Sequence, residues 1–331
     1  MGCTTESYTW ASELAPSDLE AVVAIFGAGW LEWNPRQHPI SVPAYVDADR
    51  MSAPPQRVVK LLARAEGEVV GIGQAQWRDG EPGACLARIF VSAAHRRRGV
   101  AQSLLDALVA AVQEHGRVGI TLETVEGSPL GPALERRGFA PDLVVEQNWT
   151  DPRTIDADLL TAWVARGEAA AGYRLVAYDA PCPDDLAEDF VHARFIMNDA
   201  PRREGEPEAR FDVGELRAVE AAVEAADHRW WNVGIRHEAS GELVGFSEIY
   251  FSHKWPTMAY QGDTGVAPAH RGHGLGAWMK AVNHVRLQRE RPDVAVVSTW
   301  NANSNAPMLR INHLLGFRAV QTYRSWYLPF G

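Results

Sequence analysis

The sequence repeats itself at long range. A β-hairpin pattern, a glycine-rich turn and a closing Gly-Phe pair occur in the first half of the chain and again, in the same order, in the second half. The turn glycines Gly99 and Gly274 are 175 positions apart, and the glycines of the Gly-Phe pairs, Gly138 and Gly316, are 178 apart. Separate elements at a nearly constant offset indicate a tandem duplication of one α/β domain of ~150 residues.

The repeat divides the 331-residue chain. We expect an N-terminal domain at 1–150, a linker at 151–171 and a C-terminal domain at 172–331. The linker contains a predicted helix, Asp156–Glu168, with an apolar face that would pack it against a neighbour. Within each domain, short β-branched runs alternate with helical spacing, which predicts strands and helices. The stretch Gly29–Met51, rich in Trp, Pro and polar residues, is predicted to be irregular.

Composition limits the class of protein. Hydrophobic residues make up 46% of the chain, and none of its apolar runs has the length of a membrane span, so we expect no membrane partner. The net charge of −10 disfavours nucleic acid and favours a cationic substrate. The cysteines Cys3, Cys85 and Cys182 are scattered without metal-ligand spacing, and the N-terminus lacks a signal-peptide pattern. These features predict reduced thiols, a cytoplasmic location and no metal.

The stretch Gly262–Leu287 predicts an anion site. An apolar run ends at Pro268, a basic glycine-rich turn follows, and helical spacing begins after it. In a strand–turn–helix, the first helical N–H groups have no partner within the helix and lie at the positive end of its dipole. Glycines let a phosphate or diphosphate approach these groups closely. The turn consists of Arg271, Gly272, His273, Gly274, Leu275 and Gly276.

Both copies of this turn resemble that of a known family. They are similar to the Arg/Gln-x-x-Gly-x-Gly/Ala turn of the GNAT superfamily of acetyl-CoA-dependent N-acetyltransferases, and the tandem layout is similar to that of the mycothiol synthase type. Asn305, eleven residues before Gly316, resembles the family's later Asn…Gly-Phe element. The resemblance implies an α/β (α+β) fold of two GNAT-like domains, each a central mixed, mostly antiparallel sheet with flanking helices. The first copy of the turn comprises Arg96, Arg97, Arg98, Gly99, Val100 and Ala101.

The resemblance also implies where acetyl-CoA binds, as a cosubstrate without a metal. The turn would hold the diphosphate, and Asn305 would contact the cofactor. The first domain has Gly127 at the place of Asn305, so we expect the chemistry in the second domain. The first domain would be structural or non-catalytic, although its turn fits the cofactor. Backbone N–H donors for the thioester oxygen are implied where the fourth strand splays from the fifth, at Thr264, Gly265 and Val266 and at Phe90 and Val91.

Acetyl transfer to an amine needs a base. An alkylammonium has a pKa near ~10.4, so its free amine is disfavoured by roughly 4–5 kcal/mol at neutral pH. The strongest candidates for the base are Glu248, on a hairpin strand, and then Asp263; His253 and His270 are weaker.

The sequence departs from the family's pattern at the position of the general acid. Many members have a tyrosine four residues before the Gly-Phe pair to protonate the leaving thiolate, and here Asn312 and Leu134 stand in its place. Tyr260, Tyr323 or water would then serve, or the thiolate would leave unassisted.

These observations favour an enzyme that transfers acetyl from acetyl-CoA to a primary amine of a small molecule, by direct attack in a ternary complex, as a monomer or homodimer. The alternative is a non-catalytic acyl-CoA-binding or sensing module. A dinucleotide oxidoreductase is disfavoured, because the Gly272–Gly274 turn comes late in its domain and the acidic residue expected ~20 residues on is absent. The acidic loop Glu204–Glu215 is either a solvated loop or a lid that attracts a cationic amine.

Overall fold

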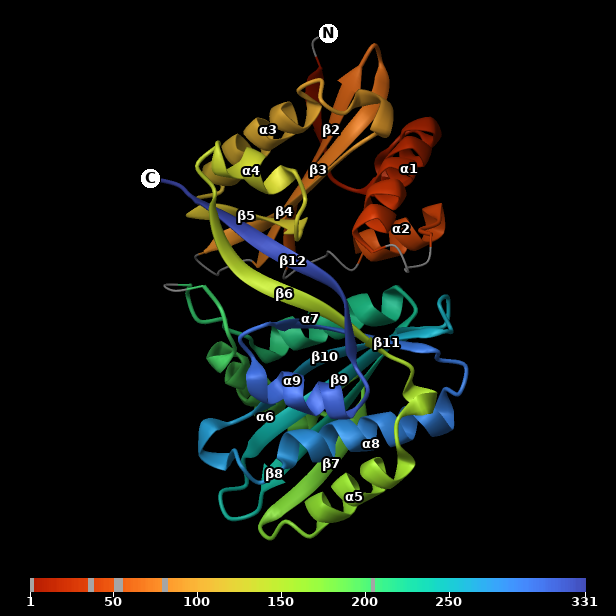
Figure 1. Ribbon diagram of the computed structural model, residues 1–331, viewed down its shortest axis with the longest axis vertical. Coiled ribbons are helices and arrows are strands. Elements are labelled where there is room, and N and C mark those ends of the chain that lie inside the picture. The colour runs from red at the N-terminus through yellow and green to blue at the C-terminus, as the bar shows by residue number, and fades with distance from the viewer. Residues whose placement is uncertain (1–2, 35–38, 51–55, 79–82, 204–205) are drawn as a thin grey trace. The chain divides into compact units, whose positions relative to one another are not determined.

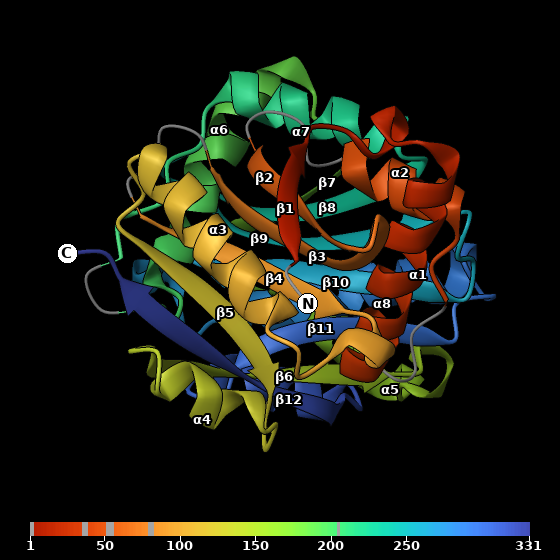
Figure 2. The same ribbon diagram turned by 90° about the horizontal axis from the view of Figure 1, so that it is seen from above.

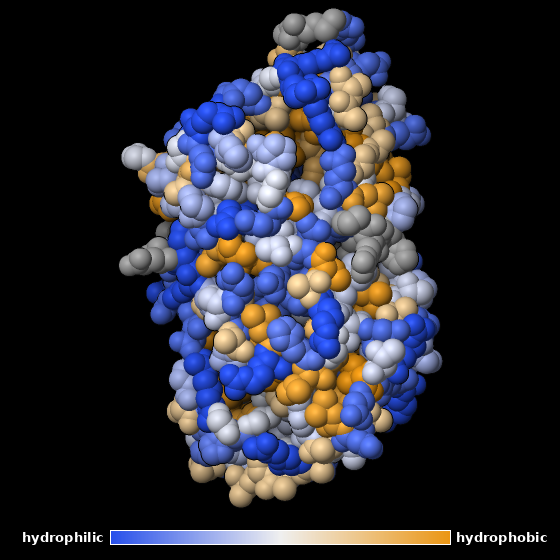
Figure 3. Space-filling model, in the orientation of Figure 1, coloured by the Kyte–Doolittle hydropathy of each residue, from blue (hydrophilic) through white to orange (hydrophobic). Residues whose placement is uncertain are grey.

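The computed structural model describes residues 3–34, 39–50, 56–78, 83–203 and 206–331 (Figure 1). The chain forms two compact units. Unit 1 consists of Met1–Leu143, Gly205–Pro207 and Tyr323–Gly331, and unit 2 of Val144–Glu204 and Glu208–Thr322. Among the described residues, no helix is long and apolar enough to cross a membrane. On the face in Figure 3, hydrophobic residues form patches scattered among hydrophilic ones.

Unit 1 is built on a sheet with the strand order β1-β2-β3-β4-β5-β12. All neighbouring strands in it are antiparallel except β4 and β5, which are parallel. The strands are β1 (Thr4–Tyr8), β2 (Gln56–Ala65), β3 (Glu68–Arg78), β4 (Ala84–Val91), β5 (Gly119–Val125) and β12 (Arg318–Pro329). The helices are η1 (Ala11–Glu13), α1 (Pro16–Trp33), α2 (Val42–Arg50), η2 (Ala93–His95), α3 (Val100–Glu114) and α4 (Leu130–Glu135).

Helices α1 and α3 cover opposite faces of this sheet (Figure 2). Successive side chains of a strand point to opposite faces. Accordingly, Leu61 packs in the hydrophobic cluster beneath α3, and its neighbour Leu62 packs in the cluster beneath α1. Alternating apolar residues in β2 and β3 therefore bury both faces of the sheet.

Unit 2 repeats the arrangement, with the strand order β6-β11-β10-β9-β8-β7. Again one pair, β10 and β11, is parallel and the others are antiparallel. The strands are β6 (Ala140–Thr150), β7 (Tyr173–Asp179), β8 (His228–His237), β9 (Leu243–Ser252), β10 (Met258–Val266) and β11 (Val296–Ala302). The helices are η3 (Pro152–Thr154), α5 (Ala157–Glu168), α6 (Asp184–Arg194), η4 (Phe195–Asp199), α7 (Val213–Ala225), η5 (Pro268–His270), α8 (Leu275–Glu290) and α9 (Ala306–Leu314). The predicted fold class is confirmed.

The two faces of the unit 2 sheet carry different helices. Helices α6 and α7 pack on β8 and β9 from one side, and α8, backed by α5, packs on them from the other. Alternation along β9 assigns its residues to the two faces: Phe246 contacts Phe190 of α6, whereas Ile249 lies in the cluster that includes Leu287 of α8. The chemistry described below uses both faces.

Each sheet ends with the last strand of the other repeat. In unit 1, residues Tyr323 to Pro329 of β12 pair with β5, and in unit 2, Val145 to Thr150 of β6 pair with β11. The last strand of each repeat therefore completes the sheet of the other repeat. The domain boundaries 1–150, 151–171 and 172–331 stay a prediction. That prediction did not include this exchange of strands.

Part of the stretch expected to be irregular is helical. Helix α1 continues to Trp33, and α2 occupies Val42–Arg50; positions 35–38 and 51 lie outside the described residues. The aromatic side chains of α1 explain its length, because Phe26 and Trp33 both pack edge-on against Phe90 of β4. In the acidic stretch, 204–205 also lie outside the described residues, and Asp212 caps α7 by accepting from the N–H of Glu215.

Candidate active site

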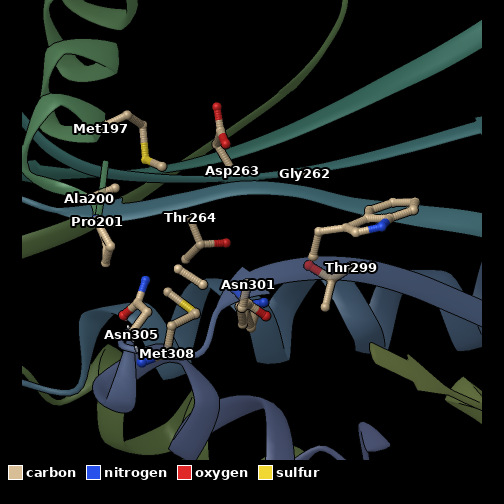
Figure 4. A pocket seen from close by; sticks show the side chains of 13 residues that line it. Met197, Ala200, Pro201, Gly262, Asp263, Thr264, Thr299, Asn301, Asn305 and Met308 are labelled. Carbon is tan, nitrogen blue, oxygen red and sulfur yellow. Dashed lines mark hydrogen bonds between the residues drawn. The ribbon is translucent and has the colours of Figure 1, made fainter. Parts of the chain in front are cut away.

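The two central parallel strands of unit 2 diverge and leave a cleft. Strands β10 and β11 pair only from Met258 with Val296 to Tyr260 with Ser298. Beyond this point a cavity of about 180 Å³ lies between them (Figure 4). Its walls come from β10, β11, α8, α9 and the segment after α6, and comprise Met197, Ala200, Pro201, Gly262, Asp263, Thr264, Lys280, Thr299, Trp300, Asn301, Ala302, Asn305 and Met308.

A β-bulge shapes the β10 wall of the cleft. The register with β9 shifts between Gln261 and Thr264, so that Gly262 and Asp263 together face Glu248. A Cβ atom at Gly262 would lie 2.7 Å from Cε2 of Tyr250, which explains the glycine there. Bulges redirect side chains and are frequent beside active sites. In Figure 4, Thr264 points toward Asn301 and Asn305, and Asp263 points away from them.

On the α6 face of the sheet, Arg194 links two carboxylates. Its Nη1 donates to Oε1 of Glu248, and its Nη2 lies 3.3 Å from Oδ2 of Asp263. The guanidinium also lies 5.0 Å from the ring centroid of Phe211. Desolvation acts to lower the pKa of Arg194, but Glu248, Tyr250 and Asp263 outweigh it and raise that pKa above its ordinary value. Arg194 therefore remains a cation.

The two carboxylates predicted as the base lie in different surroundings. Glu248 is 1% exposed, and Tyr250 donates its hydroxyl to Glu248 Oε2 at 3.2 Å. Burial raises the pKa of Glu248 to about 7, although Arg194 opposes this shift. The side chain of Asp263 is 43% exposed and lines the cleft. A substrate therefore has direct access to Asp263 and much less to Glu248.

The other predicted acids and bases are not among the residues that line the cleft. Tyr260 precedes the divergence of the strands and stacks on Trp300, with 6.0 Å between the ring centroids. Tyr323 belongs to unit 1, where its hydroxyl donates to Oδ1 of Asn34 at 2.7 Å. It is therefore not a side chain of the unit 2 cleft. His253 packs on Phe251. Nδ1 of His270 forms a hydrogen bond of 3.1 Å with the hydroxyl of Tyr173.

On the α8 face, polar side chains lie beneath the cleft. The hydroxyls of Ser247 and Thr264 are 2.9 Å apart, and Gln261 Nε2 donates to Ser247 Oγ at 3.2 Å. Helix α8 contributes three buried polar residues to this region, Lys280, Asn283 and His284. Burial lowers the pKa of Lys280 to about 7, because it desolvates the charged form. The core beneath a sheet is usually apolar, so this concentration of polar groups is unusual.

The predicted anion-binding turn follows β10 and the short helix η5 and leads into α8. Gly272 and Gly274 have φ values of +86° and +77°, which suit glycine, and Gly274 is the N-cap residue of α8. Among the described residues, no side chain caps this helix, so its first N–H groups are available to a ligand. Arg271 Nε donates to the carbonyl oxygen of Val266 at 3.0 Å, and its Nη2 contacts Asp199. His273 packs on Tyr173.

Asn305 and Asn312 belong to the α9 end of the cleft. Asn305 lines the cleft and also caps α9, accepting from the N–H of Met308 at 3.4 Å. Asn312, at the family's tyrosine position, is buried and donates through Nδ2 to Oδ1 of Asn301 at 2.7 Å.

The backbone around Gly265 lies beneath η4, since a Cβ there would lie 2.8 Å from Cγ2 of Ile196.

Unit 1 has the same turn with other surroundings. Arg96 repeats the contacts of Arg271: its Nε donates to the carbonyl of Val91 at 3.1 Å, and its Nη2 donates to Glu32 at 2.8 Å. Arg97 has a φ of +60° where unit 2 has Gly272, and Gly99 caps α3. The register of β4 with β3 shows no shift between Gly71 and Gln76.

The place where β4 and β5 of unit 1 diverge also differs from the corresponding place in unit 2. Their pairing ends at Ala87 with Leu122, and the next residues are Arg88 and Glu123. Phe90, implied as an oxyanion donor position, is buried against α1, and a Cβ at Gly29 would lie 2.1 Å from its ring. The backbone amide of Val91 follows in the same strand. The structure thus gives unit 1 the phosphate turn without the bulge of unit 2.

Sequence reasoning missed Arg194 and Lys280. Arg194 ends an ordinary amphipathic helix, and no motif singles it out. Lys280 does carry a signal, because it occupies an apolar-spaced position of α8 together with Asn283 and His284, where a helix beneath a sheet is expected to be apolar.

Comparison with known proteins finds similarity to acetyltransferases. The family model described as the acetyltransferase (GNAT) family matches residues 23–139. A mycothiol acetyltransferase of Sanguibacter keddieii is 27% identical over 264 residues, covering 78% of both chains. One of Parafrankia sp. is 27% identical over 296 residues, covering 82% of this chain and 84% of its own.

Solved structures extend the match to the whole chain. A tandem GNAT protein from the clavulanic acid biosynthesis pathway, solved without acetyl-CoA, superposes with a TM-score of 0.79 and 25% identity over 100% of this chain and 99% of its own. Residues 23–139 thus match the GNAT family model, and the whole chain is similar to a tandem GNAT protein. A GCN5-related N-acetyltransferase from Sphaerobacter thermophilus shares the fold, with a TM-score of 0.67 and 14% identity over 99% of this chain and 95% of its own.

The predicted family, its tandem type and the enzyme class are thereby confirmed, and GNAT proteins use acetyl-CoA as acyl donor. Among the described residues, no group of three or more metal-ligating side chains is found.

Proposed function

We propose that unit 2 binds acetyl-CoA and transfers its acetyl group to a primary amine of a small molecule by direct attack in a ternary complex. The observation that carries this proposal is the divergence of β10 and β11, which leaves an open cleft whose β10 wall continues directly into an uncapped helix N-terminus. An extended thioester with a diphosphate needs both features, in that order along the strand.

In this proposal the diphosphate accepts hydrogen bonds from the N–H groups of Leu275 and Gly276, and Arg271 and His273 lie beside it. The pantetheine arm runs along the exposed edge of β10 towards Asn305. Backbone N–H groups between Thr264 and Val266 stabilise the oxyanion of the tetrahedral intermediate, because fixed donors need no reorganisation during the reaction.

The acceptor approaches from the α6 face, where Asp263 presents its exposed carboxylate. A carboxylate there attracts an ammonium group and then accepts its proton. We assign Asp263 as the base in direct contact with the amine. Glu248 acts behind it through Arg194, which it holds in place.

For the acceptor we propose a small cationic amine. The net charge of −10 and the carboxylate at the cleft support a cation over an anion. The mycothiol acetyltransferases among the relatives make their own acceptor the first compound to test. Polyamines, amino sugars and amino-acid amides complete the panel.

A matched pair of variants tests which unit carries the activity. Asp and Asn both tolerate positive φ, so Gly274→Asp and Gly274→Asn differ in charge at nearly equal shape. We expect Gly274→Asp to abolish acetyl-CoA-dependent thiol release with the amine panel, and Gly274→Asn to weaken it less. Gly99→Asp and Gly99→Asn in unit 1 are the controls. Full activity in Gly274→Asp, or loss confined to Gly99→Asp, would refute the assignment to unit 2.

A further inference from the structure

The unit 2 cleft contains one buried cation with an unexplained role. Lys280 is 1% exposed and lines the cleft from α8, and it is the only basic residue among the described cleft walls. Among the described residues, neither a hydrogen bond nor an ion pair holds its ammonium group. Nζ lies 5.8 Å from the centroid of the Phe317 ring. A buried charge without a partner destabilises a fold, so it persists chiefly where function requires it.

We propose that Lys280 is the general acid that protonates the coenzyme A thiolate as it leaves. The proposal rests on the proposed function, because it requires the thioester to occupy this cleft. The family's tyrosine position holds Asn312, which has no acidic proton and donates to Asn301 instead. Lys280 supplies the missing proton from α8, the helix on the opposite side of the sheet from Asp263.

Asp263 and Lys280, the two charged residues of the cleft wall, thus act on opposite faces of the sheet, one as proton acceptor and the other as proton donor. The ammonium group first loses one proton through Asp263 to solvent. The free amine nitrogen then attacks the carbonyl carbon of the thioester and loses a second proton to Asp263. The C–S bond then breaks, and the sulfur leaves with the bonding electron pair and takes a proton from Nζ of Lys280. Neutral Lys280 regains a proton from solvent when the free thiol departs, and Asp263 releases its proton to solvent.

The chemistry of the surroundings suits this role. The desolvation that brings the pKa of Lys280 to about 7 places it below that of an ordinary thiol, about 8.5, so transfer from nitrogen to sulfur is downhill. An ordinary lysine would transfer its proton uphill. The other titratable groups nearby are His284 on the same helix, whose burial and proximity to Lys280 lower its pKa to about 3, and Asp263 and the Arg194-bound Glu248 on the β9–β10 side.

Two substitutions separate a proton donor from a charge or a structural residue. Lys280→Met keeps an unbranched stem as far as the ε position and removes the ammonium group with its proton. Lys280→Arg keeps the charge but does not release its proton near neutral pH. Arg289→Met, on an exposed position of the same helix, is the control. Thermal unfolding and acetyl-CoA calorimetry confirm that each variant is folded and loaded.

With acetyl-CoA and the best amine of the panel, we expect Lys280→Met to bind acetyl-CoA within about threefold of wild type and to lose about 10²-fold in kcat. Lys280→Arg falls to a similar level. The wild-type kcat declines above about pH 7 as Lys280 loses its proton, and this alkaline decline is absent from Lys280→Met. Unchanged kcat in Lys280→Met, or wild-type kcat in Lys280→Arg, would overturn the proposal.

A second measurement needs no acceptor. The thiol of bound CoA is titrated through the ultraviolet absorbance of its thiolate. We expect nearly equal thiol pKa values in the wild-type and Lys280→Met complexes, because Lys280 is already neutral when the thiol ionises. A thiol pKa in the wild-type complex well below that in the Lys280→Met complex would show that Lys280 keeps its proton against the thiolate, and it would overturn the assignment. If wild type does not bind CoA at all, the proposed function fails with it, and the calorimetry identifies that case.

Discussion

Nη2 of Arg194 lies 3.3 Å from Oδ2 of Asp263, on the same face of the sheet as the buried carboxylate of Glu248. The guanidinium is thus shared between an enclosed carboxylate and an exposed one. Such an arrangement fixes Asp263 at the mouth of the cleft while leaving part of its carboxylate free for a ligand. The acceptor side of the site is therefore organised by a cation from α6.

Asp263→Asn tests this arrangement. We expect kcat/KM for the amine to fall about 10²-fold or more, with little change in acetyl-CoA affinity, because the variant loses the base but none of the proposed cofactor contacts. Steady-state kinetics and calorimetry give both quantities. Glu248→Gln is the comparison and should lose less. A greater loss in Glu248→Gln than in Asp263→Asn would move the base to Glu248.

Lys280 should make stability depend on pH. Burial lowers its pKa from 10.5 to about 7 in the folded protein. Below pH 7 the lysine is charged in both the folded and the unfolded chain, so the full penalty of burial applies; between pH 7 and 10.5 only the unfolded chain holds the proton, and the penalty is relieved. We expect Lys280→Met to raise the free energy of unfolding by of order 3 kcal/mol at pH 6 and by much less at pH 10. Urea unfolding at the two pH values measures this, and a gain that grows with pH would contradict it.

Because β12 comes from the second repeat and completes the sheet of unit 1, the stability of unit 1 should depend on side chains of β12. Trp326, near the C-terminus, is 6% exposed in the unit 1 core and donates through Nε1 to Thr124 at 2.9 Å. Trp326→Ala should lower the free energy of unfolding by about 3–5 kcal/mol, because it leaves a large cavity. Trp300→Ala, at a side chain that is 39% exposed, is the control and should cost much less. Equal effects of the two substitutions in denaturant unfolding would contradict the burial of β12.

The bulge in β10 should not tolerate a side chain at Gly262. A Cβ there would meet Tyr250 at 2.7 Å and Glu248 at 3.0 Å. We expect Gly262→Ala to cost about 1–3 kcal/mol of stability and to lower activity, because Glu248 pairs with Arg194 and Tyr250 donates to Glu248. Gly27→Ala is the control: that glycine lies inside α1 with nothing within 4 Å of the added methyl, so it should gain about 0.5–1 kcal/mol. Thermal unfolding distinguishes the two, and a stabilised Gly262→Ala would refute the tight bulge.

The sequence predicted those elements whose conformation depends on residues close to one another in the chain. The turns at Gly99 and Gly274 require positive φ and an uncapped helix start, and both features are visible in the sequence as glycines between a strand and a helix. The hairpins and the order of elements follow from periodicity and turn residues in the same way. The repeat then supplied the tandem architecture.

Long-range pairing could not be predicted in this way. Nothing in residues 323–329 indicates that they pair with β5 rather than with a strand of their own repeat, since both partners offer similar backbone edges. The pairing of Arg194 with Glu248 joins residues 54 positions apart on a helix and a strand, and no periodicity links them. Tyr323 was a reasonable acid by residue type, but the strand exchange places it in unit 1.

A crystal structure of the full chain with CoA would show whether unit 2 binds the cofactor as proposed. We expect a diphosphate on the N–H groups of Leu275 and Gly276, with the pantetheine arm between β10 and β11 and its sulfur in contact with Nζ of Lys280. Density for CoA at the unit 1 turn alone, or a cleft between β10 and β11 that stays empty at saturating CoA, would contradict it.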